Sequence, residues 1–214
     1  IKNYKGAIVA IDPNNGEILT LISSPSYDPN LFVKGMNQNE FSLLKNNKNY
    51  PLFNRAISGA YPPGSTIKPA LALAALETGA TNIKRKSLCK GWYSLPGSSH
   101  RYRDWKEHGH GQVNLRSAIT ESCDVYFYEI SRDIGIDRMQ FYLDQFGLGL
   151  KTGININGEV SGLLPSRQWK KENFPNPSQQ TWFPGETIIA SIGQGYMLAT
   201  PIQLAHLAST LAMQ

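Results

Sequence analysis

The segment Tyr61-Pro62-Pro63-Gly64-Ser65-Thr66-Ile67-Lys68-Pro69 decides how this chain is interpreted, because it sets a serine at the start of a helix. The prolines and the glycine end whatever regular structure precedes them, and positions 66–76 are rich in alanine and leucine. The pattern predicts a helix from Thr66 to about Thr78, with Ser65 as its N-cap. Pro69 then falls in the first turn, where its missing N–H would have no intrahelical partner.

Ser65 and Lys68 are three residues apart, so their side chains share one face of a helix. A lysine near the positive end of the helix and partly removed from water is expected to have a lowered pKa. Such a lysine can accept a proton from a hydroxyl, which makes Ser65 a candidate nucleophile. The same spacing recurs at Ser42 and at Ser87, but neither opens an apolar helix. Context, and not spacing, therefore singles out Ser65.

The composition is that of an ordinary globular protein. The 214 residues are 41% hydrophobic and 17% charged, which suffices for one sizeable core. The net charge of +5 comes from lysines scattered among asparagines, which argues against a nucleic-acid-binding face. No apolar run is long enough to cross a bilayer. Because the sequence starts at Ile1 without methionine and stops within an expected helix, we expect it to be an excerpt.

The remaining pattern predicts mixed α and β structure. Residues 6–11 and 17–22 flank a turn of Asp, Pro, Asn and Gly, which predicts a β-hairpin. Further helices are expected at 39–44, 115–121, 125–134, 137–146 and 201–213, with 89–111 irregular and 151–185 mostly loop. No repeat or linker interrupts the chain, so residues 1–214 are predicted to belong to a single domain.

Ser122-Cys123-Asp124 lies between two expected helices and supplies a second hydroxyl and a carboxylate. By itself Ser-x-Asp is common, and such residues before a helix are most often its N-cap. The tripeptide becomes informative only together with the segment that carries Ser65 and Lys68.

Together these segments resemble the transpeptidase domain of the class B penicillin-binding proteins, most closely the penicillin-binding protein 2 group of the cell-elongation machinery. The resemblance covers nearly the whole chain: Gly6–Thr20, Arg55 with Tyr61–Pro69, Gly91–Gly111, Ser122–Asp124 and Gly193–Pro201. Aspartate at position 124 matches the elongation type, where many related enzymes have asparagine. The resemblance implies an α/β fold of the penicillin-recognising, β-lactamase-like type, with helices on both faces of an antiparallel sheet. Residues 1–214 would be a partial transpeptidase domain without the C-terminal strands.

The resemblance also implies a role for each site residue. Ser65 would attack the penultimate D-Ala carbonyl of a peptidoglycan stem peptide, with Lys68 as general base. Ser122 would pass a proton toward the leaving amine, and Asp124 would fix the hydrogen-bond geometry. An amine of a neighbouring strand would then accept the acyl group and form a cross-link, whereas a β-lactam would leave Ser65 acylated. Catalysis of this kind needs no cofactor. The backbone N–H of Ser65 is expected in the oxyanion hole, where one donor contributes about 3 kcal/mol.

Lys151-Thr152-Gly153 has the composition of the third motif of that family, but it stands in the wrong place. In the family this motif follows the Gly-Gln-Gly segment, which here is Gly193-Gln194-Gly195. We therefore predict that Lys151 lies in a loop and has no catalytic role. The motif itself, with the second oxyanion donor, is expected beyond Gln214, so the excerpt alone should be poorly active or inactive.

Two cysteines suggest a second site, since Cys89, Asp104, His110 and Cys123 follow one another as Cys-x14-Asp-x5-His-x12-Cys. Two thiolates, an imidazole and a carboxylate would complete the shell of a tetrahedral, structural zinc ion. Relatives in some bacteria have a zinc site in this region, and these positions resemble it. A Cys89–Cys123 disulfide and two free thiols are the alternatives that remain open. His108 could replace His110.

The resemblance implies partners that the sequence itself does not contain. These are stem peptides, β-lactams, a glycosyltransferase and membrane proteins of the elongation complex, at the periplasmic face of a bacterial inner membrane. The basic, aromatic string Arg101–Trp105 is interpreted as a loop beside the active site and not as a nucleic-acid contact. Two rival functions stay open: a β-lactamase or β-lactam sensor of the same fold, and a non-catalytic scaffold that binds morphogenesis partners.

Overall fold

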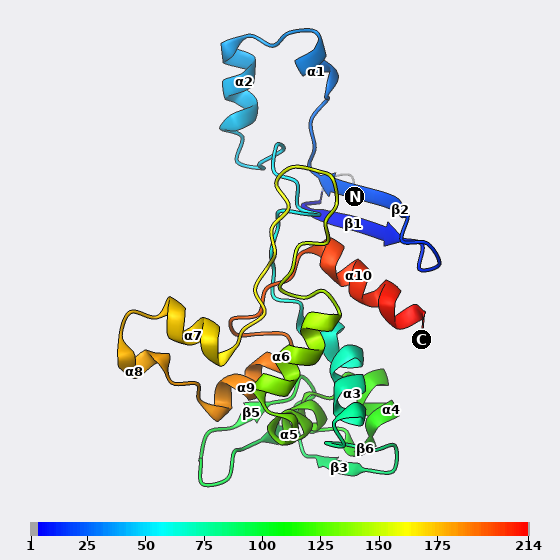
Figure 1. Ribbon diagram of the computed structural model, residues 1–214, viewed down its shortest axis with the longest axis vertical. Helices are drawn as coiled ribbons and strands as arrows, with labels where there is room; N and C mark the ends of the chain where they lie inside the picture. The colour runs from blue at the N-terminus through cyan, green and yellow to red at the C-terminus, as the bar shows by residue number, and fades with distance from the viewer. Residues whose placement is uncertain (1–3, 214) are drawn as a thin grey trace.

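The computed structural model describes residues 4–213. The upper part of the molecule in Figure 1 contains a β-hairpin. Strand β1 (Gly6–Ile11) pairs antiparallel with β2 (Ile18–Ser24), and the last helix, α10 (Pro201–Ala212), packs against β1 (Figure 1). A small core of buried residues joins them to the chain around Ala56 and Ile57. The predicted hairpin and the predicted C-terminal helix are both confirmed.

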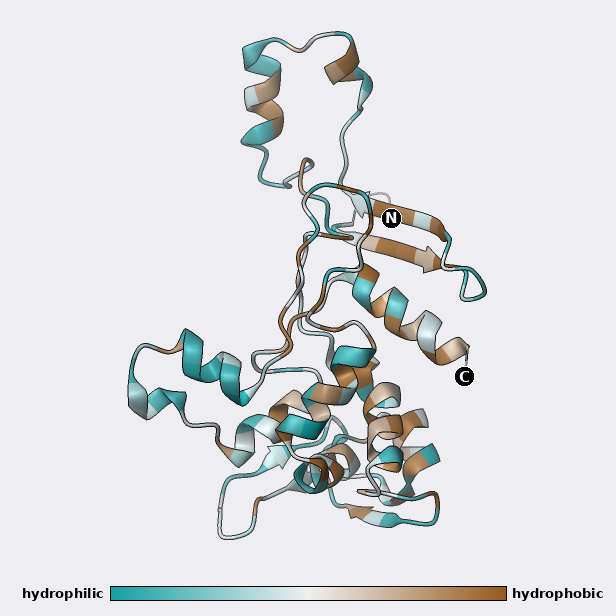
Figure 2. Cartoon of the chain, in the orientation of Figure 1, coloured by the Kyte–Doolittle hydropathy of each residue, from teal (hydrophilic) through white to brown (hydrophobic). Residues whose placement is uncertain are grey.

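The lower part is a cluster of helices that surrounds α5 (Asp124–Ile134). Helices α3 (Lys68–Glu77), α4 (Leu115–Thr120), α6 (Ile136–Gln145) and α9 (Pro184–Ala190) all pack against it. Tyr126 and Phe127 of α5 are fully buried in the main hydrophobic core, and apolar residues are concentrated in these helices in Figure 2. Burial of apolar area on this scale is the main stabilising term of the fold.

Short strands border the helical cluster. Strand β3 (Lys86–Cys89) pairs antiparallel with β6 (Gly111–Asn114), and β4 (Trp92–Tyr93) pairs antiparallel with β5 (Tyr102–Arg103). The sequence predicted residues 89–111 to be irregular, which was wrong for β4 and β5. Strands of two to four residues are too short to show an alternating pattern of apolar residues.

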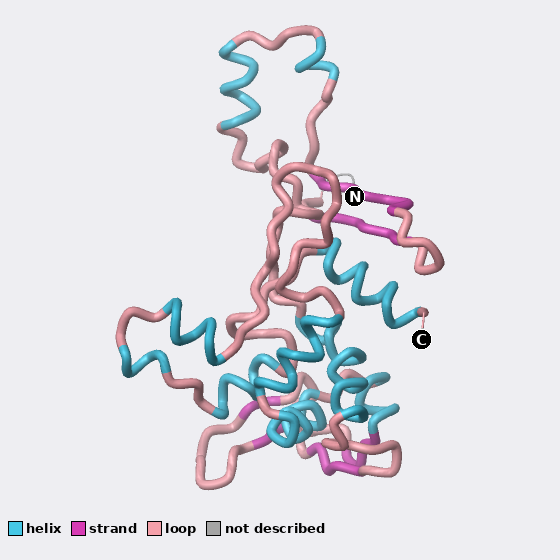
Figure 3. The backbone as a smooth tube through the Cα atoms, viewed as in Figure 1, coloured by secondary structure: helices cyan, strands magenta, loops and turns pink. Residues whose placement is uncertain are grey.

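Two further helix pairs lie outside the helical cluster. Helices α1 (Asn30–Val33) and α2 (Gln38–Lys45) stand at the far end of the molecule from it (Figure 1). Helices α7 (Arg167–Asn173) and α8 (Pro177–Gln180) interrupt the long loop segments that Figure 3 shows, where the sequence predicted mostly loop. The side chains of Ser166 and Asn176 cap these two helices, and their short length hid them from a periodicity argument. No helix in the described part of the chain is long and apolar enough to cross a membrane.

The helix around Ser65 begins differently from the prediction. A 3-10 helix, η1 (Gly64–Ile67), precedes α3, so Ser65 lies inside a helical turn and is not an N-cap. The N-cap position of α3 belongs to Ile67, whose side chain makes no capping hydrogen bond. Pro63 already has helical dihedral angles, so the helix starts earlier than a serine cap would allow. Pro69 does lie in the first turn of α3, as expected.

A glycine contact fixes the turn that carries Ser65. The Gly64 N–H donates to the carbonyl of Gly193 at 2.9 Å, and Gly193 has a φ of +69°. A Cβ atom on Gly193 would lie 2.2 Å from the Gly64 carbonyl oxygen, so no other residue fits there. Tyr61 and Ala199 exchange two backbone hydrogen bonds just beyond this contact. The Gly193–Pro201 segment is therefore the support of the Ser65 turn.

We predict that Gly193→Ala destabilises the protein more than Gly79→Ala does. Both glycines have φ near +70°, so either alanine variant strains the backbone. A Cβ atom on Gly79 would meet nothing within 4 Å, so Gly79→Ala serves as the control for backbone strain without a steric clash. The additional steric clash at Gly193 should cost at least about 2 kcal/mol more in urea unfolding. Equal losses for the two variants would show that the Gly64–Gly193 contact is not tight.

Candidate active site and metal centre

The buried ammonium group of Lys68 is the centre of the candidate active site. Lys68 is 2% exposed, and its Nζ lies 2.6 Å from Asp124 Oδ1, 2.8 Å from the Ser122 carbonyl oxygen and 3.1 Å from Ser122 Oγ. An ammonium group has three protons to donate, and these three oxygens take all of them. The structure thus brings Lys68 together with Ser122 and Asp124, which lie 54 and 56 positions further along the chain.

Ser65 lies one turn before Lys68 and is exposed to solvent. Residues three apart in a 3-10 helix lie directly above one another, so the two side chains share a face as predicted. Within residues 4–213, however, no hydrogen bond joins them, because the lysine points toward Ser122 and Asp124. The hydroxyl of Ser65 is therefore free to meet a molecule from solution.

Ser122 has an unusual backbone conformation. Its φ is +54°, a region that residues with a side chain enter rarely and at a cost of about 1 kcal/mol or more. This conformation lies between α4 and α5, and the bond from Lys68 Nζ to the Ser122 carbonyl helps to hold it. The result is that both the carbonyl and the hydroxyl of Ser122 face the lysine.

Asp124 is the first residue of α5, whose N-cap is Cys123, so the simple capping interpretation of the Ser-x-Asp tripeptide does not apply. Its side chain is 11% exposed and both of its oxygens are bonded. Oδ1 accepts from Lys68, and Oδ2 accepts from the backbone N–H of Trp105 at 3.1 Å. A carboxylate in the first turn of a helix is also stabilised by the helix dipole.

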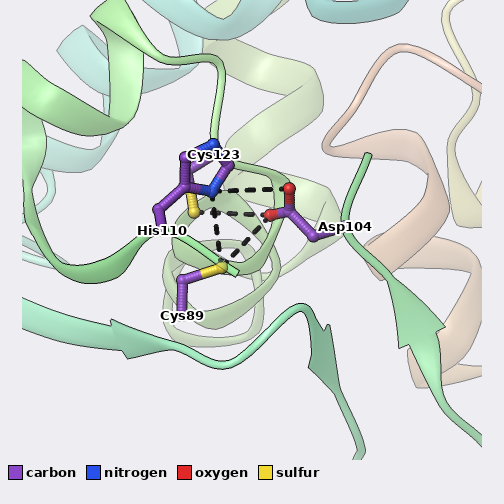
Figure 4. A group of neighbouring side chains, drawn as sticks. All are labelled: Cys89, Asp104, His110 and Cys123. Carbon is purple, nitrogen blue, oxygen red and sulfur yellow. Dashed lines mark hydrogen bonds and ion pairs between the residues drawn. The ribbon is translucent and has the colours of Figure 1, made fainter. Parts of the chain in front are cut away.

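A compact cluster, drawn in Figure 4, is formed by Cys89, Asp104, His110 and Cys123. Asp104 Oδ2 lies 3.4 Å from each of the two sulfur atoms, and His110 Nδ1 lies 3.5 Å from Cys89 Sγ and from Asp104 Oδ1. Zinc–ligand bonds of about 2.0–2.3 Å in a tetrahedron place the ligand atoms about 3.3–3.8 Å apart, so these distances fit a zinc shell. The cysteines are unbridged, and His108 lies exposed outside the cluster.

Hydrogen bonding and burial set the protonation of this cluster. Burial by itself would raise the pKa of Asp104, but hydrogen bonds from the Lys106 and Val125 N–H groups and from both thiols lower it. Burial, with the neighbouring Asp104 charge, raises the pKa of the Cys123 thiol. A bound cation would reverse this preference, since a thiol that coordinates a metal loses its proton.

Two reciprocal hydrogen bonds connect the cluster to the active site. Asp104 Oδ2 accepts from the Val125 N–H at 3.1 Å, and Asp124 Oδ2 accepts from the Trp105 N–H at 3.1 Å. Each carboxylate thus bonds the backbone directly after the other. The sequence alone gave no sign of this exchange, because the residues that donate use only their backbone.

The Lys151-Thr152-Gly153 segment lies in a loop, as predicted. The buried carboxylate of Glu159 accepts hydrogen bonds from the N–H groups of Thr152 and Gly153. Lys151 itself is exposed. The segment is therefore a loop whose backbone is held by the Glu159 carboxylate.

Comparison with known proteins gives a family match over nearly the whole chain. The family described as "Penicillin binding protein transpeptidase domain" matches residues 6–214. The chain is 50% identical over 201 residues to "Peptidoglycan D,D-transpeptidase MrdA" of Acinetobacter baumannii, covering 94% of this chain and 29% of that protein. For the protein of the same name in Escherichia coli K12 the identity is 47%, covering 94% and 31%. The chain therefore spans about a third of the length of these relatives.

Solved structures confirm the predicted fold type. Pseudomonas aeruginosa PBP2 in complex with WCK 5153 matches with a TM-score of 0.94 at 47% identity, over 99% of this chain and 45% of that one. PBP2 from Helicobacter pylori matches with a TM-score of 0.92 at 37% identity, over 99% and 39%.

We predict that Asp124→Ala strongly destabilises the protein, because it leaves the buried Lys68 charge without its carboxylate partner. Losing one partner of a buried ion pair should lower the free energy of unfolding by about 3 kcal/mol or more. The control is Asp133→Ala, on the same helix, which removes an ion pair with Arg85. The side chains of Arg85 and Asp133 are 26% and 32% exposed, so this loss should lower the free energy of unfolding by less than about 1 kcal/mol. Denaturant unfolding measures both, and a loss at Asp124 no larger than at Asp133 contradicts the prediction.

Proposed function

The chain belongs to the penicillin-binding protein transpeptidase family, and on this premise we propose that it carries the acylating residues of a peptidoglycan D,D-transpeptidase. The observation that supports this most is the Lys68 ammonium bound to Ser122 and Asp124, one turn from the exposed Ser65. Nucleophile, proton acceptor and proton relay are thereby within one site. The proposal treats residues 1–214 as part of a single transpeptidase domain.

Ser65 is the nucleophile that attacks the carbonyl carbon of the penultimate D-Ala of a stem peptide. Lys68 must be neutral before it can take the proton of Ser65. Two groups contact Lys68 Nζ and can receive a proton from it: Asp124 Oδ1 and Ser122 Oγ. Ser122 then returns a proton to the leaving D-Ala amine. An acceptor amine attacks the acyl-enzyme, which releases Ser65 and forms the cross-link. The Ser65 N–H lies in the first turn of η1, where N–H groups have no intrahelical partner. It is therefore free to donate one of the hydrogen bonds that stabilise the oxyanion of the tetrahedral intermediate.

We propose that a structural zinc ion is held by Cys89, Asp104, His110 and Cys123. With four protein ligands the ion has no open position, so it supplies no catalytic chemistry and no cofactor is needed for the reaction. It would join the strands β3 and β6 to the residue between Ser122 and Asp124. The 3.4–3.5 Å contacts among the ligand atoms favour zinc over the disulfide alternative.

The proposed place of action is the periplasmic face of a bacterial inner membrane, with elongation proteins as partners. The similar PBP2 from Helicobacter pylori forms a complex with MreC, and another similar chain is part of a peptidoglycan synthase complex. Partners of these kinds are therefore the first to test for this protein.

The catalytic proposal predicts that Ser65→Ala abolishes labelling by a fluorescent penicillin in the whole protein that carries this sequence. Ser42→Ala is the control, because Ser42 and Lys45 have the same spacing but do not belong to the group formed by Lys68, Ser122 and Asp124. This variant should be labelled like the wild type. Gel fluorescence after a fixed incubation measures both. Equal labelling of Ser65→Ala and wild type refutes the proposal, and a wild-type label lost within seconds indicates a β-lactamase instead.

The zinc proposal predicts about one zinc ion per purified protein, by mass spectrometry of the metal content. His110→Ala should reduce the zinc content and lower the melting temperature, whereas His108→Ala should change neither, since His108 is exposed outside the cluster. A zinc content near zero in the wild type, together with an oxidised cysteine pair, contradicts zinc.

A further inference from the structure

A wide groove opens on the outer side of the Asp104 segment. It has a volume of about 1120 Å³, and its walls come from the β4–β5 hairpin and the chain that follows it to His108. Strand β5 lies in the lower part of the molecule in Figure 1 and packs against α5. No residue of the Lys68 network lines this groove, and the mechanism proposed above does not use it.

The groove is lined by cations that have no counter-ion. Lys90 Nζ lies 3.7 Å from the centre of the Trp92 ring, and Arg101 Cζ lies 4.2 Å from it. The Trp92 ring thus contacts two cations, each through a cation–π interaction. Neither cation has an ion pair or a hydrogen-bond acceptor for its side chain within residues 4–213. Both cations are therefore available to an anion from solution.

The balance of charge along the groove is also positive. Arg103 adds a third exposed, unpaired cation to the lining, together with His100 and His108. Glu107 is the exposed carboxylate of the lining, whereas Asp104 is buried and its oxygens point into the metal-ligand cluster. The accessible walls therefore present three permanent positive charges and one negative charge.

The groove adjoins the active site through two consecutive residues. Asp104 forms part of the wall, and the backbone N–H of the next residue, Trp105, donates to Asp124 Oδ2. Asp124 in turn contacts Lys68. The groove wall is therefore connected to Lys68 through Asp124.

We propose that this groove, with Lys90, Arg101 and Arg103 as its cations, binds the free carboxylates of a peptidoglycan stem peptide. The carboxylates meant are those of the stem-peptide residues that precede the two D-Ala residues, because the terminal carboxylate lies one residue from the carbonyl that Ser65 attacks. Guanidinium groups bind carboxylates through paired hydrogen bonds, and here Trp92 holds one of them in place before binding. The groove is a subsite for substrate recognition and takes no part in bond breaking. The proposal rests on the proposed transpeptidase function.

A nucleic acid fits the same groove less well. Binding of single strands depends on aromatic rings that are open for stacking with bases, and the Trp92 ring is already in contact with two cations. The basic and aromatic string that the sequence showed at Arg101–Trp105 is therefore assigned to carboxylate recognition.

The test measures binding of a soluble disaccharide-peptide with free carboxylates to the whole protein, by calorimetry at low salt. The double variant Arg101→Gln with Arg103→Gln should bind about tenfold more weakly, and the amidated form of the same fragment should bind the wild type with a similar loss. Lys84→Gln with Arg116→Gln, which removes the same total charge at exposed positions outside the groove, should bind like the wild type.

Penicillin acylation of Ser65, followed in every variant, separates this proposal from the catalytic one. Normal acylation together with unchanged binding in the groove variant overturns the subsite and leaves the transpeptidase function standing. Equal binding of the amidated and free fragments overturns it as well. A groove variant that loses binding to phosphatidylglycerol vesicles or inorganic phosphate, but not to the fragment, identifies a phosphate site instead.

Discussion

The burial of one ammonium group constrains the rest of this structure. Lys68 is almost completely removed from water, and a buried charge is tolerated only when paired and fully hydrogen-bonded. Its partners come from the start of α5 and from the residue before the α5 N-cap, so α3 and α5 must meet at this point. The left-handed backbone of Ser122 follows from the same requirement, because it turns both of that residue's oxygens toward the lysine.

A second layer holds the partners of Lys68 in place. Asp104 and Asp124 each accept a hydrogen bond from the backbone next to the other, so the metal-ligand cluster and the active site share one framework. Cys123 belongs to both, since its sulfur atom lies in the cluster and the residue lies between Ser122 and Asp124 in the chain. A change at the cluster would therefore reach Lys68 through Asp124.

The elements that could be predicted from the sequence are those with long, regular patterns. The hairpin with its Pro-Asn-Asn-Gly turn and the helices α3, α5, α6 and α10 have enough residues for a pattern to emerge. The strands β3 to β6 and the helices α7 and α8 do not, because contacts with distant segments define them. The helix start at Ser65 was misplaced for a related reason: Gly193 supports that turn from more than a hundred residues away, and local capping rules contain no such contact.

The sequence by itself determined the family, the candidate nucleophile and lysine, and the four candidate metal ligands, because these depend on residue types at fixed spacings. Only the tertiary structure decided that Lys68 bonds Ser122 and Asp124 and, within residues 4–213, makes no hydrogen bond to Ser65. It also decided that the carboxylates of Asp104 and Asp124 each accept a backbone hydrogen bond from the residue after the other. The same holds for the contacts of Lys90 and Arg101 with the Trp92 ring. Each of these contacts joins segments or side chains whose distance is set by the packing of the helical cluster. Side-chain direction and long-range distance are properties of the packed chain, and a linear pattern does not contain them.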